Sequence, residues 1–395
     1  MKKSLLFFAG LAVSLCAVAQ TFESGTEYYI RNVKTGMWLN GGYSWGTKGI
    51  LKPQARAFEL VQNGDAYVLK SACGYVKRQG GEIFIDGGQG DATKMTVKAA
   101  GEGVYTISDG SWNLAPEAAM FTYGGTESWE SSQGAMHSYD FYPVTGVDNA
   151  SDEAAAWQIL TRQEMIAELA SATSEAPKDA TFLIKAHMMD VNDGDNTKVW
   201  LVNGEADKLV IPDPGWGFGA NSWINNGRYG WFTNDEPAAD TQDVISQTVE
   251  GAPEGCYTVE YRVVNQANTP MTVNFNTTAA EATSYESSDL WYGSAYDALK
   301  DQANIKTADF TVGKDGKLAI SINKESKAGE QNRFAFKSFI LKYKGNSTSG
   351  IGSVETEDAD APEEFYTLQG IRVAQPSAGL YIVKKGGKAT KRIVR

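Results

Sequence analysis

Histidine and cysteine are scarce in this chain of 395 residues. Its only histidines are His137 and His187, and its only cysteines are Cys16, Cys73 and Cys256. Because histidine and cysteine are the usual protein ligands of zinc, haem iron and iron–sulfur clusters, their scarcity argues against such centres. We therefore expect no cofactor that depends on these ligands.

Basic residues are outnumbered as well. The chain has 36 Lys and Arg against 48 Asp and Glu, which gives a formal net charge of −12 at pH 7. Proteins that bind nucleic acid without regard to sequence need a basic surface to contact the phosphates. We therefore expect no nucleic-acid partner.

Long apolar runs are absent beyond the first 20 residues, so the sequence predicts no transmembrane segment in the mature chain. The first residues are basic (MKK), an apolar run follows, and the run ends in Ala17-Val18-Ala19. This order is typical of a secretory signal peptide, here residues 1–19, whose removal would leave Gln20 first. We expect the mature protein to be secreted or held on the outer cell surface.

The remaining composition favours strands over helices. The chain contains 41 Gly, 16 Phe, 10 Trp and 18 Tyr, and these residues are typical of turns and β-strands. The length suggests two or three domains. We therefore predict an all-β protein.

A period of 38 residues runs through the first part of the chain. Tyr29, Tyr67 and Tyr105 each begin a similar stretch of strand, glycine turn and second strand. An apolar residue follows nine positions later, as Trp38, Val76 and Leu114. A second strand-like element recurs as FELV at 58–61, MTVK at 95–98 and WQIL at 157–160.

Three such units, none able to bury its own apolar face, predict a closed three-fold β-trefoil over residues 26–161. The layout resembles that of the ricin-like β-trefoil lectins. The QxW signature of that family is missing, so none of its sugar-contacting residues is transferred here. Trp45 and Trp129 lie in loops rich in Gly and Ser and are candidates for glycan contact, with a loop-anchoring role as the alternative. Residues 162–179 are predicted to be a linker helix and loop.

Residues 180–345 are predicted to form a β-sandwich. Short strands are joined by turns with little helical pattern between them, and the alternation of apolar and polar residues is clean in CYTVEYRVV and KLAISI. The stretches VISQTVEGAPEGCYTVEYRV, DGKLAISI and FAFKSFILKY resemble strands of the galactose-binding-like jelly roll found in carbohydrate-binding modules. That resemblance implies a ligand site in the loops at one end of the sandwich.

The candidate loop spans residues 213–237 and combines aromatic rings with amide and guanidinium donors. Rings stack on the apolar faces of sugars, and the donors bond to sugar hydroxyls. The predicted glycan-binding residues are Trp216, Trp223, Asn225, Arg228, Tyr229 and Trp231, which Trp291 could join. The alternative is that several of these rings fill the interior of the sandwich.

A short acidic stretch follows the start of the sandwich. Asp190, Asp193 and Asp195 in DVNDGD offer hard oxygen ligands that suit calcium. The order of acids and glycine does not fit an EF-hand loop, and a solvated acidic turn is the alternative. Apart from this structural calcium, we expect no cofactor.

The end of the chain changes composition twice. Residues 346–364 are polar and acidic and are predicted to be a linker, whereas residues 365–395 hold seven bases and no acid. The terminal stretch resembles the C-terminal sorting domains of the type IX secretion pathway of Bacteroidetes, on the strength of Tyr366, Leu368, Gly370, Arg372, Gly379, Tyr381 and Val383. The resemblance implies contact with secretion machinery. The alternative is a small domain packed on the sandwich.

No catalytic constellation is convincing. The GYSWG stretch at 42–46 fits a nucleophile elbow by its letters, but the residues after Ser44 are not helical. We therefore predict a protein that is not an enzyme, and that binds glycans or glycoconjugates on the cell surface. The alternatives are an adhesive protein that binds other proteins and a glycoside hydrolase with an unfamiliar pair of carboxylates.

Overall fold

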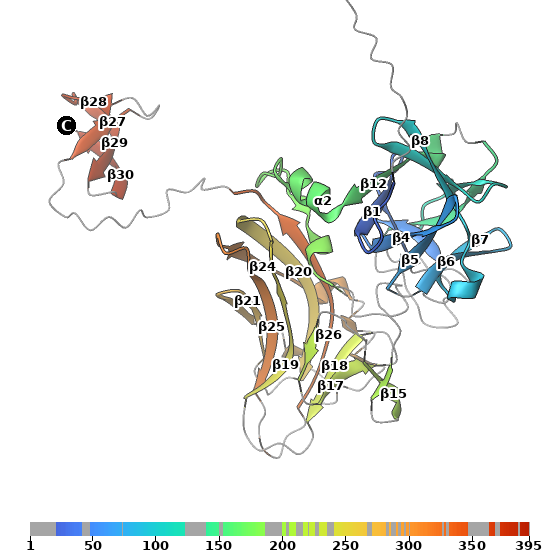
Figure 1. Cartoon of the computed structure of the whole chain (residues 1–395). Coiled ribbons are helices and arrows are strands. Elements are labelled where there is room, and N and C mark those ends of the chain that lie inside the picture. Colours follow the sequence, from blue (N-terminus) through green and yellow to red (C-terminus); the bar gives the residue numbers. More distant parts are fainter. Residues whose placement is uncertain are drawn as a thin grey trace, which may run out of the picture. The chain divides into compact units, whose positions relative to one another are not determined.

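The structure is a computed structural model, and the chain divides into two compact units, residues 1–345 and 346–395. The residues that it describes are 21–41, 48–72, 74–122, 140–149, 153–185, 200–202, 205–210, 216–219, 221–225, 229–234, 241–266, 271–281, 284–285, 290, 294–295, 298–299, 301–325, 328, 332–346, 363–367, 372–385 and 388–394. The predicted all-β class is confirmed: a β-trefoil, a β-sandwich and a small β unit follow one another along the chain (Figure 1).

Six strands of the trefoil close a barrel. Their pairing runs β1, β4, β5, β8, β9, β12 and back to β1, with an isolated bridge from Tyr67 to Met95 joining β5 to the start of β8. The bounds are Glu27–Asn32 (β1), Ala57–Asn63 (β4), Ala66–Ser71 (β5), Thr96–Gly101 (β8), Val104–Ser108 (β9) and Trp157–Thr161 (β12). The three elements predicted at 58–61, 95–98 and 157–160 thus take equivalent places as β4, β8 and β12.

Three hairpins complete the trefoil. They are β2 with β3 (Trp38–Gly41, Gly49–Lys52), β6 with β7 (Gly74–Gln79, Glu82–Gly87), and β10 with β11 (Asn113–Pro116, Tyr142–Val147). The hairpins also touch one another, because Leu51 pairs with Tyr142 and Lys48 bridges to Phe84. One hairpin per repeat on a closed barrel is the three-fold arrangement expected from the period.

A single phenylalanine marks the three-fold axis. The ring of Phe22 lies edge-on to Tyr28, Tyr67 and Tyr105, at centroid distances of 5.3, 5.4 and 5.8 Å. Each of these tyrosines comes from a different repeat, so one central ring makes the same edge-to-face contact with all three repeats. Phe22 itself is 6% exposed.

The predicted register of the first repeat is one residue out. The structure places Tyr28 in the barrel core, whereas Tyr29 lies outside it and contacts Phe182 at 5.7 Å between ring centroids. Leu39 likewise lies in the barrel core, whereas Trp38 is buried on the other side of the strand. The first turn is longer than its two counterparts, and a shift of one residue along a strand moves a side chain to the other face.

A short helix follows the trefoil. Helix α2 (Arg162–Leu169) begins at a capping box: Thr161 Oγ1 accepts from the Glu164 N–H, and the Glu164 carboxylate accepts from the Thr161 N–H at 2.7 Å. Arg31 of β1 donates two hydrogen bonds to the Glu168 carboxylate, at 2.8 and 2.6 Å. The helix is therefore tied to the barrel by charge as well as by the end of β12.

Two sheets make the sandwich. The larger runs β14, β15, β17, β18, β26, β20 and β23, with β13 added to β26 and β24 to β20, and the smaller runs β16, β19, β25, β21 and β22. The bounds are Lys178–Asp179 (β13), Trp200–Val202 (β14), Glu205–Val210 (β15), Gly217–Phe218 (β16), Ser222–Asn225 (β17), Tyr229–Asn234 (β18), Thr241–Val249 (β19), Gly255–Gln266 (β20), Met271–Phe275 (β21), Thr278–Glu281 (β22), Ser284–Tyr285 (β23), Ile305–Val312 (β24), Leu318–Glu325 (β25) and Asn332–Tyr343 (β26).

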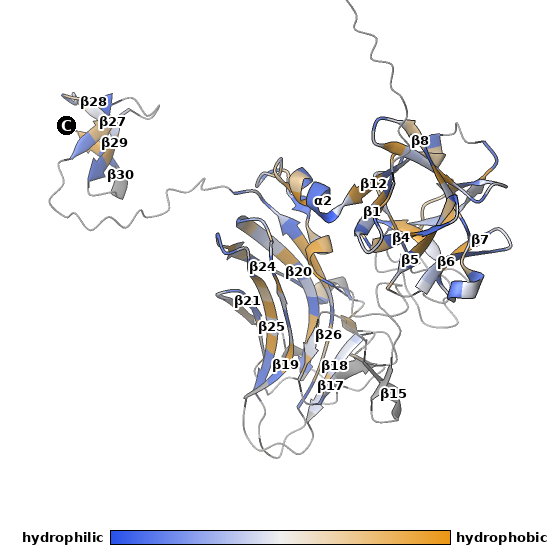
Figure 2. Cartoon of the chain, in the orientation of Figure 1, coloured by the Kyte–Doolittle hydropathy of each residue, from blue (hydrophilic) through white to orange (hydrophobic). Residues whose placement is uncertain are grey.

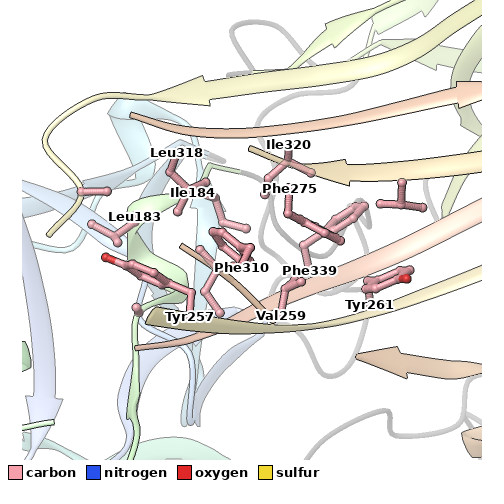
Figure 3. Close-up of a cluster of buried hydrophobic side chains, with 14 of the residues drawn as sticks. Leu183, Ile184, Tyr257, Val259, Tyr261, Phe275, Phe310, Leu318, Ile320 and Phe339 are labelled. Carbon is pink, nitrogen blue, oxygen red and sulfur yellow. The ribbon is translucent and has the colours of Figure 1, made fainter. Parts of the chain in front are cut away.

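The core of the sandwich lies between these sheets and is rich in aromatic rings. Figure 3 shows Tyr257, Tyr261 and Phe339 from the larger sheet facing Phe275 and Ile320 from the smaller one. Tyr261 and Phe275 approach to 5.3 Å between centroids. Hydrophobic and hydrophilic residues alternate along these strands (Figure 2), so each sheet turns one face to the core and the other outward.

The terminal unit is a four-stranded sheet in the order β28, β27, β29, β30. Its strands are Glu364–Tyr366 (β27), Arg372–Val373 (β28), Gly379–Lys385 (β29) and Lys388–Val394 (β30). Figure 1 draws it at the red end of the chain.

Candidate functional site

The outer face of the five-stranded sheet carries an organised set of small polar side chains. They form two rows across β19, β25 and β21: in one row Ser246 is opposite Ser321, which is opposite Asn274, and in the other Asp243 is opposite Asn323, which is opposite Thr272. Asp243 and Ser246 are exposed and the other four are half-buried. These six residues are called the amide face below.

The strand alternation explains why they gather there. Leu318, Ile320 and Ile322 of β25 are buried between the sheets, so Ser321 and Asn323 must point outward. In β21 the buried residues are Met271, Val273 and Phe275, which leaves Thr272 and Asn274 on the outer side. Backbone register then brings the polar residues of neighbouring strands side by side.

Hydrogen bonds fix the orientation of the two amides. Asn274 Nδ2 donates to Asn323 Oδ1 at 2.6 Å and to Ser321 Oγ at 3.3 Å. Asn323 Nδ2 in turn donates to Asp243 Oδ1. Since each amide is held by a neighbour, the amide face is ordered in advance of any ligand.

This row of hydrogen bonds leaves some side-chain donors and acceptors available to a ligand. Within the described residues, the side-chain oxygen of Asn274 and the second carboxylate oxygen of Asp243 accept no hydrogen bond, and the Ser321 hydroxyl donates none. Amide and hydroxyl groups with both donors and acceptors pair well with sugar hydroxyls. The arrangement is therefore chemically suited to a neutral polyhydroxylated ligand.

The larger sheet carries a different kind of outer surface along β24 and β20. There Lys344 pairs with Asp309 at 2.9 Å, and the Lys344 and Thr258 hydrogen bonds lower the pKa of Asp309, the Thr258 bond most strongly. An ion pair as exposed as this one contributes little to stability. The amide face has no Lys or Arg, which distinguishes it from that solvated surface.

Trp216, Tyr229 and Trp231 are buried, which corrects their predicted role as glycan-stacking rings. Trp216 is 4% exposed; its indole N–H donates to the Lys185 carbonyl at 2.7 Å, and its ring packs on Phe339. Tyr229 and Trp231 are each 1% exposed. A ring enclosed by protein has no free face to offer a sugar, so the alternative interpretation holds for these three residues.

The stretch 213–237 was predicted to be a loop, but the structure finds β16, β17 and β18 in it. Trp223 of β17 is opposite Trp231 of β18, as aromatic residues in paired strands often are. Trp231 then lies beside Ala335 and Val264 on the side of the larger sheet that Leu290 covers. Strand pairing, which a single stretch of sequence does not display, turned these rings toward apolar neighbours.

The structure does not describe the side chains of the remaining predicted residues. Trp223 and Asn225 lie in β17, but their side chains fall outside the described part of the structure. The described residues also leave out Trp45, Trp129, Arg228, Trp291, Asp190, Asp193 and Asp195. Their predicted roles in glycan or calcium binding remain predictions.

Two further features concern metals and membranes. Within the described ranges, no group of three His, Cys, Asp or Glu residues is placed to hold a metal ion. Among the same residues, no helix has the length and apolar content that crossing a bilayer would require.

A polar cluster around Asp109 stabilises a turn of the trefoil. Arg78 donates to Asp109 at 2.8 Å and lies over the Trp112 ring at 4.7 Å. Burial raises the pKa of Asp109, but hydrogen bonds from Ser111, the Trp112 backbone and Arg78 outweigh it and lower the pKa. The Asp109 carboxylate is thus held ionised as a turn anchor, and a general acid would need the opposite shift.

Comparison with known proteins gives no family. No family model matches the chain, and no curated protein matches it.

Solved structures do resemble parts of it. A ricin B-like lectin of Macrolepiota procera in complex with lactose is 20% identical over 35% of this chain and 98% of its own, with a TM-score of 0.27. TmCBM61 in complex with β-1,4-galactotriose is 15% identical over 32% of this chain and 86% of its own (TM-score 0.21), and a CBM4 structure is 13% identical over 37% and 84% (TM-score 0.18).

Proposed function

We propose that this protein binds carbohydrate, and that the amide face is a binding site. The observation that carries the proposal is the hydrogen-bonded row of Asn274, Asn323 and Asp243 on an outer sheet face. A row of fixed donors and acceptors loses little side-chain entropy when a ligand binds, which favours binding.

The chemistry of the amide face narrows the substrate class. Asp243 is its one charged residue, so an anionic sugar would meet repulsion with no cation to offset it. We therefore infer neutral glycans, bound without catalysis. A contribution from calcium at Asp190, Asp193 and Asp195 is part of the proposal and depends on the acidic sequence alone.

The test is a glycan array followed by affinity gels of the selected polysaccharides, with and without calcium. The double variant Asn274→Ala/Asn323→Ala removes the amides, and Thr307→Ala/Thr311→Ala, two exposed residues of β24, is the matched control on the other sheet. We expect the first to lose about tenfold or more in affinity and the control to be unchanged. If the gels retain both variants equally, the glycan binds at a site other than the amide face. If the parent protein binds no glycan, the adhesive alternative is favoured.

We further propose that the chain is exported to the outer surface of a Bacteroidetes-type bacterium, with residues 365–395 as the sorting signal. The support is the apolar leader with its small-residue cleavage site and the resemblance of the terminal stretch to sorting domains. Deletion of residues 365–395 should leave the protein in the periplasm, and cell fractionation would measure this. Unchanged surface exposure would contradict this route.

A further inference from the structure

The terminal unit turns two large aliphatic side chains to solvent on one face of its sheet. Leu380 of β29 is 45% exposed and Ile393 of β30 is 68% exposed. They are directly opposite each other across the two strands. Directly opposed residues share a face of the sheet, so the two side chains form one apolar patch.

Lysines flank this patch on the same face. Lys391 is two residues from Ile393 and opposite Ile382, and Lys384 lies on the same side of β29 as Leu380. Both lysines are exposed, and neither forms an ion pair with the described residues. The Leu380, Ile382, Lys384, Lys391 and Ile393 surface is called the basic aliphatic face below.

The opposite face of the sheet has a different role. There Val383 is 3% exposed, Phe365 and Tyr381 meet edge to face, and Arg392 lies over the Phe365 ring at 5.5 Å. The interior of the unit is thus on that side. The basic aliphatic face is therefore not the inward side of a core.

The sheet segment of the terminal unit is basic, whereas the linker before it is acidic. Residues 363–395 contain seven Lys and Arg but only Glu363 and Glu364 as acids. Glu363 pairs with Arg392 at 2.7 Å and Glu364 pairs with Arg372 at 2.8 Å. Both acids thus pair with arginines, and neither forms an ion pair with Lys384 or Lys391, although Glu364 lies opposite Lys384 in the sheet.

We propose that the basic aliphatic face docks on an anionic lipid surface. In this arrangement Leu380 and Ile393 enter the boundary between headgroups and acyl chains, while the two lysines reach the lipid phosphates. Tyr366 and Arg372 share this side of the sheet, but Arg372 is paired with Glu364. The exposed aliphatic pair with its flanking lysines lies on an open strand face, which suits a lipid surface better than the pocketed anchors of a protein interface. The proposal is independent of carbohydrate binding, because it uses no residue of the amide face.

The test is co-sedimentation of the full chain with vesicles. Vesicles of phosphatidylcholine containing about one third phosphatidylglycerol are compared with pure phosphatidylcholine, at low and at high ionic strength. We expect retention on the anionic vesicles only, reduced about tenfold by high salt. Absence of retention on the anionic vesicles would overturn the proposal.

Three variants locate the contact. Lys384→Glu/Lys391→Glu reverses the flanking charges and should reduce binding about tenfold or more, and Leu380→Ser/Ile393→Ser should reduce it about tenfold. Lys314→Glu/Lys317→Glu makes the same charge change at exposed sandwich positions and should bind as the parent does. Parent-like binding by the serine variant would also overturn the proposal, because the aliphatic pair would then take no part.

Folding of the terminal unit needs its own check. If circular dichroism indicates that a double variant has lost structure, the single change Ile393→Ser, at the more exposed of the two aliphatic positions, replaces it. Retention of the same proteins on the glycan gels tests the carbohydrate proposal separately. The two proposals can therefore fail independently.

Discussion

Asn274 and Asn323 meet across β21 and β25, where the Asn274 amide donates to the Asn323 side-chain oxygen at 2.6 Å. Asn323 passes the interaction on, because its own amide donates to Asp243. The order of donors and acceptors in the row depends on Asn323 being an amide, which can do both.

Asn323→Asp should break this row without changing the size of the side chain. Aspartate cannot donate to Asp243, and two carboxylates would then lie side by side. We expect the free energy of unfolding at pH 7 to fall by about 1 kcal/mol, measured by chemical denaturation. Asn323→Ser keeps a donor and should lose less; an aspartate variant as stable as the parent would show that the hydrogen bond is not formed in solution.

Lys324 predicts an unusual pH dependence. Its side chain is fully buried, and burial lowers its pKa from 10.5 to about 7, against a smaller opposing effect of Glu325. In the unfolded chain the lysine stays protonated up to its ordinary pKa, so between pH 7 and 10.5 the unfolded state binds more protons. The contribution of Lys324 to stability therefore rises with pH across that window.

Lys324→Met should remove this slope. The variant is expected to be more stable than the parent by about 2 kcal/mol at pH 7, with the advantage shrinking toward pH 10. Denaturation curves at several pH values measure it, and Lys317→Met, at an exposed lysine of the turn before β25, is the control. A constant difference between variant and parent across this range would rule out the proposed titration.

Gly146 of β11 allows the Trp112 ring to pack on the backbone. A Cβ atom added there would lie 2.3 Å from Trp112 Cδ2, far inside contact distance. Gly146→Ala should therefore destabilise the trefoil by about 2 kcal/mol, measured as a lower melting temperature. Gly81→Ala, where a Cβ meets nothing within 4 Å, should leave the melting temperature within a degree or so.

Thr161 begins α2 and should be sensitive to loss of its hydroxyl. Thr161→Ala removes the acceptor for the Glu164 N–H and should cost about 1 kcal/mol, whereas Thr161→Asn keeps an acceptor and should cost less. Chemical denaturation of the two variants side by side measures the difference. Equal losses would mean that the Thr161 methyl group, rather than the cap, stabilises the helix start.

The trefoil could be predicted from the sequence because its repeats are local. Tyr67 and Tyr105 each start a strand, turn and strand within a short stretch, and the structure places them equivalently around Phe22. The first repeat was assigned through Tyr29 because a tyrosine follows a tyrosine there, and only the packing against Phe22 selects Tyr28. Spacing alone does not say which of two adjacent residues faces inward when both are aromatic.

The site was harder to predict because it depends on strands that are distant in the sequence. Asp243, Asn274 and Asn323 become neighbours only through the order β19, β25, β21. A signal was present: the outward positions of KLAISINK and MTVNF hold Ser321, Asn323 and Asn274 in place of long charged residues. Trp216 and Trp231 are predicted to contact a glycan because aromatic residues among glycines are typical of exposed loops. In the structure, strand pairing buries them.

The way the chain enters and leaves each module has a mechanical consequence. In the trefoil Tyr28 is opposite Thr161, and in the sandwich Lys178 is opposite Tyr343, so each module holds its first and last strands as an antiparallel pair. Tension on the chain would peel these pairs apart one residue at a time, whereas a parallel pair would resist in shear. Force applied between the two ends of a module would therefore load its terminal pair in this peeling geometry.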